Sequence, residues 1–174
     1  MKFNNFVTTI FFLVSCISLA NAENKIVYVD MDYLLNKSLV GINVYKKLSE
    51  NQKSKVSELK KIENDLKKNE SEIIQQKNII TKEEFEKKII KLREKASKYQ
   101  NKRKETNINL SKKRAQGTAD LVLIIQNILS EYSIKEDIAI IFQKKNIVIG
   151  KSNLEITSDI LNILNDKHKT MKVK

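Results

Sequence analysis

Residue types that support catalysis or metal binding are scarce in this sequence. Its 174 residues contain one cysteine, Cys16, and one histidine, His168, near opposite ends of the chain. Nucleophilic triads and zinc sites need several such side chains within reach of one another. The three glycines are widely separated, so they cannot form a phosphate-binding loop. We therefore expect no enzyme activity, no metal and no cofactor.

Asp30 and Asp32 could be the paired carboxylates of an acid–base site. They follow a short, β-branched segment, residues 25–30 (KIVYVD), which has the pattern of a strand. Two carboxylates in this position can in principle share a proton, but aspartate is also a preferred helix cap. We favour the capping interpretation.

The stretch over residues 37–132 predicts two long helices folded back on each other. It contains no proline, and its two glycines lie toward its ends. Residues 81–84 (TKEE) form a capping box, in which the Thr81 hydroxyl accepts from the Glu84 amide and the Glu84 carboxylate accepts from the Thr81 amide. A helix therefore begins there, and the tip of the hairpin lies near residues 79–84.

Each arm of this hairpin has a narrow stripe at heptad spacing, as an antiparallel two-helix coiled coil requires. In the first arm, over residues 37–78, the stripe contains Tyr45, Gln52, Leu59, Leu66, Ile73 and Ile80, with Leu48, Lys55, Ile62, Asn69 and Gln76. In the second arm it contains Phe85, Leu92, Tyr99 and Thr106, with Ile89, Ala96, Arg103 and Leu110. Polar members weaken the seam, so we expect the arms to bend and to fray toward the tip. About 42 helical residues would span roughly 60 Å.

The positive charge of the chain is concentrated in the arms. The whole sequence has 33 basic and 21 acidic residues, a net charge of +12. Residues 43–115 hold 22 basic and 11 acidic residues, whereas residues 116–174 hold 8 and 7. The arms would thus attract an anionic partner, although lysine-rich helices can also be merely solvated.

The amino terminus has the pattern of a secretory signal peptide. A positive start is followed by an apolar run over residues 6–19 and by Ala20-Asn21-Ala22. We predict cleavage between Ala22 and Glu23, which exports a cysteine-free chain and argues against a nucleic-acid partner. An alternative is a lipoprotein signal, in which Cys16 would carry the lipid.

The segments outside the hairpin predict a small apolar body. Residues 138–142 and 147–149 have the pattern of strands, residues 119–129 form a helix that is apolar nearly all round, and a short helix starts at Thr157 or Ser158. The residues after Asp166 have the composition of a frayed basic tail. The expected body core includes Ile26, Val27, Val29, Ile138, Ile140, Ile141, Ile147 and Ile149. Three short strands bury little by themselves, so we expect this body to be completed by oligomerisation.

The order of these elements resembles the Skp/OmpH family of periplasmic chaperones. Residues 25–30 (KIVYVD) look like the family's first strand. Residues 147–161 look like its closing segment, with Glu155-Ile156-Thr157 where the family has Asp-Ile-Thr. The resemblance implies an α+β, predominantly helical fold: a long helical hairpin that projects from a β-barrel body completed by trimerisation. The boundaries would be a signal peptide over 1–22, a body over 23–41 and 116–174, and an arm over 42–115.

The resemblance also implies a function. Members of the family hold unfolded outer-membrane proteins between basic arms in the periplasm, without ATP, and their basic surface would also attract anionic lipid or lipopolysaccharide. The candidate client surface in this chain is Lys60, Lys61, Lys67, Lys68, Lys87, Lys88, Lys91 and Arg93. The apolar tip residues Ile79, Ile80 and Phe85 would either touch clients or, as we favour, close the seam.

Two questions stay open at the level of sequence. Gly117, where the arm meets the body, is either a hinge or a site of close helix packing. The same hairpin would also suit a structural or tethering protein of the cell envelope, especially if Cys16 carried a lipid.

Overall fold

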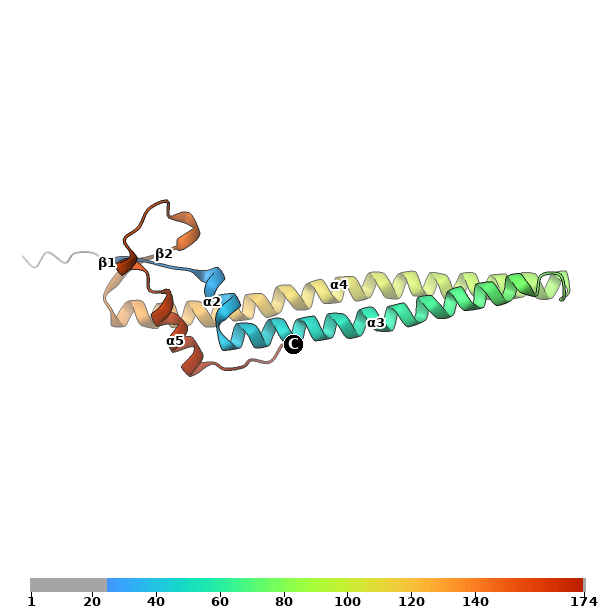
Figure 1. Ribbon diagram of the computed structural model, residues 1–174, viewed down its shortest axis with the longest axis horizontal. Coiled ribbons are helices and arrows are strands. Elements are labelled where there is room, and N and C mark those ends of the chain that lie inside the picture. Colours follow the sequence, from blue (N-terminus) through green and yellow to red (C-terminus); the bar gives the residue numbers. More distant parts are fainter. Residues whose placement is uncertain (1–24, 174) are drawn as a thin grey trace, which may run out of the picture.

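Two antiparallel helices form most of the molecule (Figure 1). The computed structural model describes residues 25–173, so the predicted cleavage site and Cys16 lie outside the described residues. Helix α3 (Leu39–Gln75) and helix α4 (Lys82–Lys135) run side by side from a small body to a distant tip. The predicted hairpin is confirmed.

Side-chain caps set where the helices begin. Asp30 caps α2 (Met31–Lys37) and accepts a hydrogen bond of 2.8 Å from the Tyr33 amide, which confirms the capping interpretation. The buried Ser38 hydroxyl caps α3 and accepts from the Gly41 amide at 3.1 Å. A cap satisfies amides that the first helical turn leaves without partners. The break between α2 and α3 therefore lies at Ser38.

The tip of the hairpin follows the predicted capping box. The Glu84 amide donates to the Thr81 hydroxyl at 3.2 Å, and the Thr81 amide donates to the Glu84 carboxylate at 3.1 Å. Before it, the Gln76 amide closes the last turn of α3 by donating to the Glu72 carbonyl at 3.2 Å. Helix α4 thus begins at a site that was readable from four residues of sequence.

The body contains two strands, β1 (Lys25–Val29) and β2 (Ile138–Gln143), which pair in parallel with Ile26 opposite Ile140. Parallel neighbours need a long crossover connection, and here the whole helical hairpin serves as that connection. The other edge of β1 is bridged at Glu155, and the Ile156 amide donates to the Tyr28 carbonyl at 2.9 Å.

The third strand predicted over residues 147–149 is not formed in this chain. A 3₁₀ turn at Lys144–Asn146 directs the chain away from β2, and a second turn at Ser152–Leu154 returns it to the far edge of β1. Both edges of β1 are then in use, so residues 147–149 find no strand edge beside it. Val148 and Ile149 are instead 98% and 91% exposed.

One apolar cluster joins the sheet, the base of the hairpin and helix α5 (Thr157–Lys167). Its buried members are Val27, Val29, Leu34, Val40, Val44, Leu121, Ile125, Ile128, Ile138, Ile156, Ile160 and Leu164. Of the other predicted core residues, Ile141 packs against the cluster, Ile147 is half-buried, and Ile26 and Ile140 are exposed.

The residues after α5 are not frayed as predicted. The chain returns along the base of the hairpin (Figure 1), and Met171 and Val173 pack against the cluster. The Lys47 ammonium donates to the Met171 carbonyl at 3.1 Å. The apolar character of these two residues, spaced by one lysine, outweighs the basic composition of the segment.

Candidate functional site

The eight basic residues predicted as a client surface lie along the outer part of the arm. Two hydrogen bonds between α3 and α4 show how the helices are aligned. The Tyr99 hydroxyl donates to Glu63, and the Lys88 ammonium donates to Gln76. Lys60–Lys68 on α3 are therefore level with the middle of the arm, and Lys87–Arg93 on α4 are nearer the tip. The structure spreads these residues along the arm in two groups instead of gathering them at one point.

Some of these cations already have acidic neighbours. Lys67 lies 2.7 Å from Glu63, and Lys87 lies 2.7 Å from Glu83, both one helical turn away. The hydrogen bond that Lys67 donates to Glu63, together with the charge of that carboxylate, raises the pKa of Lys67. Exposed pairs of this kind contribute little to stability and are screened by salt.

The remaining cations have fewer internal partners. Lys60, Lys61, Lys91 and Arg93 are exposed and form no salt bridge with any residue over 25–173. These four are the most accessible to an anionic partner.

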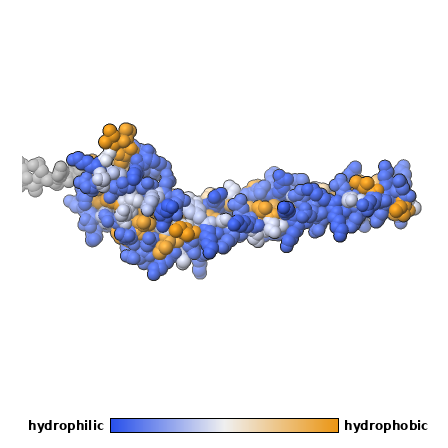
Figure 2. All heavy atoms as spheres, viewed as in Figure 1, coloured by the Kyte–Doolittle hydropathy of each residue, from blue (hydrophilic) through white to orange (hydrophobic). Residues whose placement is uncertain are grey.

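The tip combines seam residues with an exposed apolar side chain. Ile80 and Phe85 are half-buried, as expected if they close the seam, but Ile79 is 81% exposed. Figure 2 shows apolar surface at this end of the arm and again on the body, separated by a mostly hydrophilic rod. Seam closure therefore accounts for Ile80 and Phe85 and leaves Ile79 available to a partner.

An ion cluster ties the two helices together in the inner half of the arm. Glu58 on α3 lies 2.9 Å from Lys55 on the same helix and 2.5 Å from Lys102 on α4. Hydrogen bonds from Lys102 and then Lys55, with their charges, lower the pKa of Glu58 from 4.5 to about 2. Glu58 is therefore charged throughout the neutral range.

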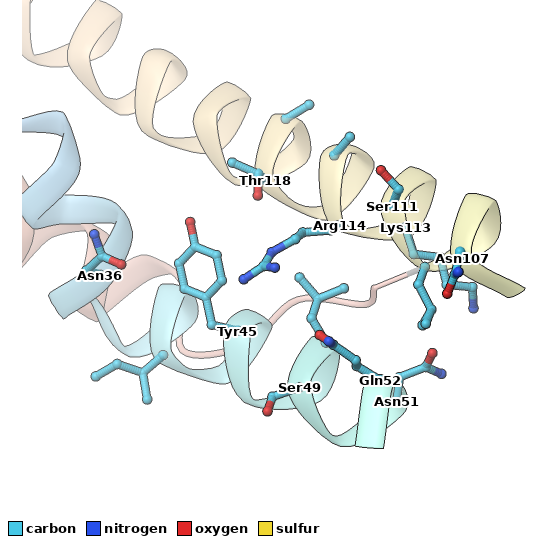
Figure 3. A pocket seen from close by; sticks show the side chains of 15 residues that line it. Asn36, Tyr45, Ser49, Asn51, Gln52, Asn107, Ser111, Lys113, Arg114 and Thr118 are labelled. Carbon is cyan, nitrogen blue, oxygen red and sulfur yellow. The ribbon is translucent and has the colours of Figure 1, made fainter. Parts of the chain in front are cut away.

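Between this cluster and the body, α3 and α4 separate around a cleft of about 1410 Å³. Figure 3 shows Tyr45 of α3 and Arg114 of α4 pointing toward each other across the space. A smaller cavity of about 490 Å³ lies beside it and shares Asn51, Leu110 and Lys113 with it.

This cleft was not predicted, although its cause is visible in the heptad positions of α3. Gln52 and Lys55 stand in consecutive seam positions of α3, and both are exposed. Long polar side chains gain nothing from burial between helices, so the seam opens where they occur. The small side chains of Ala115 and Ala119 on the α4 side leave further space.

Gly117 lies at the inner end of the same region. It is buried inside α4, which continues without a break on either side of it. A Cβ at this position would lie 3.6 Å from Leu48 and 3.7 Å from Val44 of α3. Gly117 thus stands at a close contact between the helices, while its hinge role stays a prediction.

Comparison with known proteins identifies the family. The family model described as "Outer membrane protein (OmpH-like)" matches residues 25–164, most of the chain. The chain belongs to the OmpH-like family. The matched range includes both helices of the hairpin, the sheet and nearly all of α5. No curated protein matches the sequence significantly.

A solved structure shows the same fold in a distant OmpH-like relative. The crystal structure of a candidate outer membrane chaperone (OmpH-like) from Caulobacter crescentus CB15 aligns with a TM-score of 0.76. Its sequence is 17% identical, and the alignment covers 87% of this chain and 89% of that one. The fold of the OmpH-like chain is thus confirmed as predominantly helical, with long helices and a small sheet. No helix over residues 25–173 is sufficiently long and apolar to cross a membrane.

Proposed function

We propose that this OmpH-like chain is an ATP-independent holdase chaperone of the periplasm. In this proposal it assembles as a homotrimer and holds unfolded outer-membrane proteins between its basic arms. The observation that carries the proposal is the arm itself: a thin, cationic helical hairpin that reaches far beyond the apolar core described for residues 25–173 (Figure 1). Such an arm buries little of itself and exposes a large surface to a partner.

The surface chemistry of the arm supports weak binding at many points. Exposed cations alternate with acids along both helices, and only isolated apolar residues such as Ile79 stand between them. Contacts of this kind bind a flexible chain without requiring one conformation. A holdase acts by lowering the concentration of free unfolded chain, and that needs neither a nucleotide nor a catalytic group.

The incomplete body supports self-association. Ile26, Ile140 and Phe142 are about half exposed on the small sheet, and Val148 and Ile149 project from the loop beside it. Apolar groups clustered near sheet edges are typical of surfaces that another chain covers. In a trimer these residues would lie between subunits, and three arms would surround a shared space.

The test uses residues 23–174 and a urea-unfolded outer-membrane β-barrel protein diluted into buffer. Light scattering reports aggregation, and tryptophan fluorescence reports the client alone because this chain contains no tryptophan. We expect scattering to be suppressed at about three chains per client and less strongly at high salt. Sedimentation of the same sample tests the trimer.

Two charge variants test whether client binding depends on the cations of the arm or only on the net charge of the protein. The arm variant changes the four least-paired cations, Lys60, Lys61, Lys91 and Arg93, to Gln. The matched variant changes four exposed body lysines to Gln, namely Lys135, Lys145, Lys151 and Lys169. The proposal requires the arm variant to suppress scattering less well than the body variant. Unchanged scattering with the unaltered chain would reject the chaperone role and favour a tethering protein of the envelope.

A further inference from the structure

The cleft at the base of the arm has a composition unlike the rest of the arm surface. Fifteen residues line the main cavity and eight line the smaller cavity beside it, and no aspartate or glutamate occurs in either set. Four cations are present: Lys55, which already pairs with Glu58, and Lys112, Lys113 and Arg114. Farther along the arm, Lys67, Lys68 and Lys87 each pair with a glutamate one turn away. Lys112, Lys113 and Arg114 form no salt bridge with any described residue.

This imbalance creates a positive field inside a hollow. Cations that line a cleft with low-dielectric walls attract anions more strongly than the same cations on a convex surface. The cleft has such low-dielectric walls because apolar side chains form its floor. Leu48 and Leu110 are half-buried there, and Tyr45 also lines the cleft. The cleft therefore suits a partner that has both apolar groups and negative charges.

The length of the cleft indicates an extended polypeptide. The lining of the main cavity runs from Ile42 to Gln52 on α3 and from Asn107 to Ala119 on α4, roughly 15 to 18 Å along the helices at 1.5 Å per residue. An extended chain rises about 3.3 Å per residue, so about five residues fit. Side chains of such a segment alternate between two faces, which places one set on the floor and the other at the cationic rim.

The polar lining favours a peptide over a lipid. Asparagine, glutamine, serine and threonine side chains make up almost half of the main cavity, namely Asn36, Ser49, Asn51, Gln52, Asn107, Ser111 and Thr118. An extended backbone needs hydrogen-bond partners along its whole length, and these side chains offer both donors and acceptors. An acyl chain has no use for them.

We propose that this cleft binds an extended segment of an unfolded client in which apolar residues alternate with acidic ones. The inference rests on the proposed chaperone function and specifies where one part of the client binds. Strands of outer-membrane β-barrels have alternating apolar and polar residues, so a strand whose polar positions are acidic has the pattern that this cleft would select. The outer arm would supply diffuse contacts, and the cleft would supply a defined one.

The first experiment places a fluorescent label in the cleft. Residues 23–174 contain no cysteine, because Cys16 precedes them. Ser111→Cys puts a single label on the cleft lining, and Ser97→Cys puts one on an exposed position farther along α4. The probe is a twelve-residue peptide of alternating aspartate and leucine. We expect it to change the emission at Ser111→Cys with saturation and to leave Ser97→Cys unchanged.

The second experiment removes charge in matched pairs on one helix. Lys113→Gln with Arg114→Gln alters the cleft, and Arg103→Gln with Lys104→Gln removes the same two residue types from exposed positions farther along. We expect the cleft pair to raise the Kd of the acidic peptide about tenfold, as loss of charge-assisted contacts does, and the control pair to change it less than about twofold. A peptide with lysine in place of aspartate should not bind. Equal losses in the two variants would overturn the inference in favour of diffuse attraction.

Other occupants give different results. If vesicles of anionic phospholipid shift the Ser111→Cys label and the peptide does not, a lipid site replaces the peptide site. If the label is shielded in the free protein and exposed only on dilution, a second copy of the chain fills the cleft. If the protein suppresses client aggregation but the peptide does not change the label emission, the peptide site in the cleft is refuted and the chaperone function is retained. If the protein does not suppress client aggregation, the proposed function itself is refuted.

Discussion

Val173 lies against Gly117, although 56 positions separate them in the sequence. The Val173 Cγ1 is 3.5 Å from the point that a Cβ on Gly117 would occupy, and Leu48 and Val44 approach the same point at 3.6 and 3.7 Å. The tail, α3 and α4 therefore meet where the arm leaves the body. All three distances are ordinary van der Waals contacts, so the site has room for one methyl group.

Gly117→Ala should stabilise the protein. Glycine in the middle of a helix costs about 0.5–1 kcal/mol relative to alanine, and the added methyl meets no close contact. We expect a rise of this size in the free energy of unfolding, measured in urea at fixed protein concentration. If the substitution leaves stability raised but abolishes aggregation suppression, Gly117 acts as a hinge. A fall in stability would show that the contact at this site is tighter than the structure describes.

Gly41→Ala should have the opposite effect. A Cβ at Gly41 would lie 2.0 Å from the carbonyl oxygen of Leu35 and 2.9 Å from the Ser38 hydroxyl oxygen. A backbone carbonyl cannot rotate away as a side chain can, so α2 would have to move off α3. We expect a loss of about 3 kcal/mol or more, within the range of severe overpacking. The two glycine variants form a matched pair, and similar unfolding midpoints for both would contradict this account.

The two glycines also show where sequence reasoning was sufficient and where it was not. Local signals predicted the caps at Asp30 and Thr81 and the helical hairpin correctly, because each depends on a few neighbouring residues. The close approach of Leu35 to Gly41 depends on the angle between two helices, which no local pattern encodes.

Contacts between residues that are far apart in the sequence explain the remaining differences between the predictions and the structure. The strand predicted at residues 147–149 has a suitable composition, but in this chain Glu155 takes the edge of β1. The basic residues of the arm were predicted individually, whereas the acid-free cleft arises from polar seam positions on one helix facing small residues on the other. Composition shows which segments are able to form a strand or a charged cleft. Only the packing of the folded chain shows which of these segments do so.

The tail contact gives a prediction about residues 168–173. Met171 and Val173 are half-buried against the body, and Lys172 between them is exposed. Val173→Ser removes apolar contacts with α3 and α4, so we expect a loss of about 1 kcal/mol in the free energy of unfolding. Lys172→Ser is the matched control and should change stability little. Equal effects of the two changes would mean that the tail is not docked in solution.

The Glu58 cluster gives a prediction about pH. Its pKa is lowered to about 2 mainly by the hydrogen bond from Lys102, and then by that from Lys55. A lowered folded-state pKa contributes stability that is present above the ordinary value of 4.5 and lost as the pH falls through about 2. Because the pair is exposed, that contribution is small and screened by salt. An NMR titration of the Glu58 carboxyl should show a midpoint near 2.

Substitution of a Glu58 partner tests why the pKa of Glu58 is lowered. Lys102→Gln should move the Glu58 midpoint upward, because the largest cause of the shift is removed. Lys104→Gln removes an equal charge from an exposed position on α4 without touching Glu58 and should leave the midpoint in place. If both variants shift it equally, the lowered pKa arises from the general positive field of the arm and not from the bond across the two helices.

The capping box gives a prediction confined to the tip. Thr81→Ala removes the hydroxyl that accepts from the Glu84 amide, and N-cap losses of this kind cost about 1 kcal/mol. The tip is far from the apolar core, so the loss should appear as faster amide hydrogen exchange over residues 82–85 and hardly at all in the global unfolding midpoint. Thr81→Ser keeps the hydroxyl and should preserve slow exchange. A large fall in the global midpoint would mean that the arm and body unfold as one cooperative unit, and that the arms are stiffer than their sparse seam suggests.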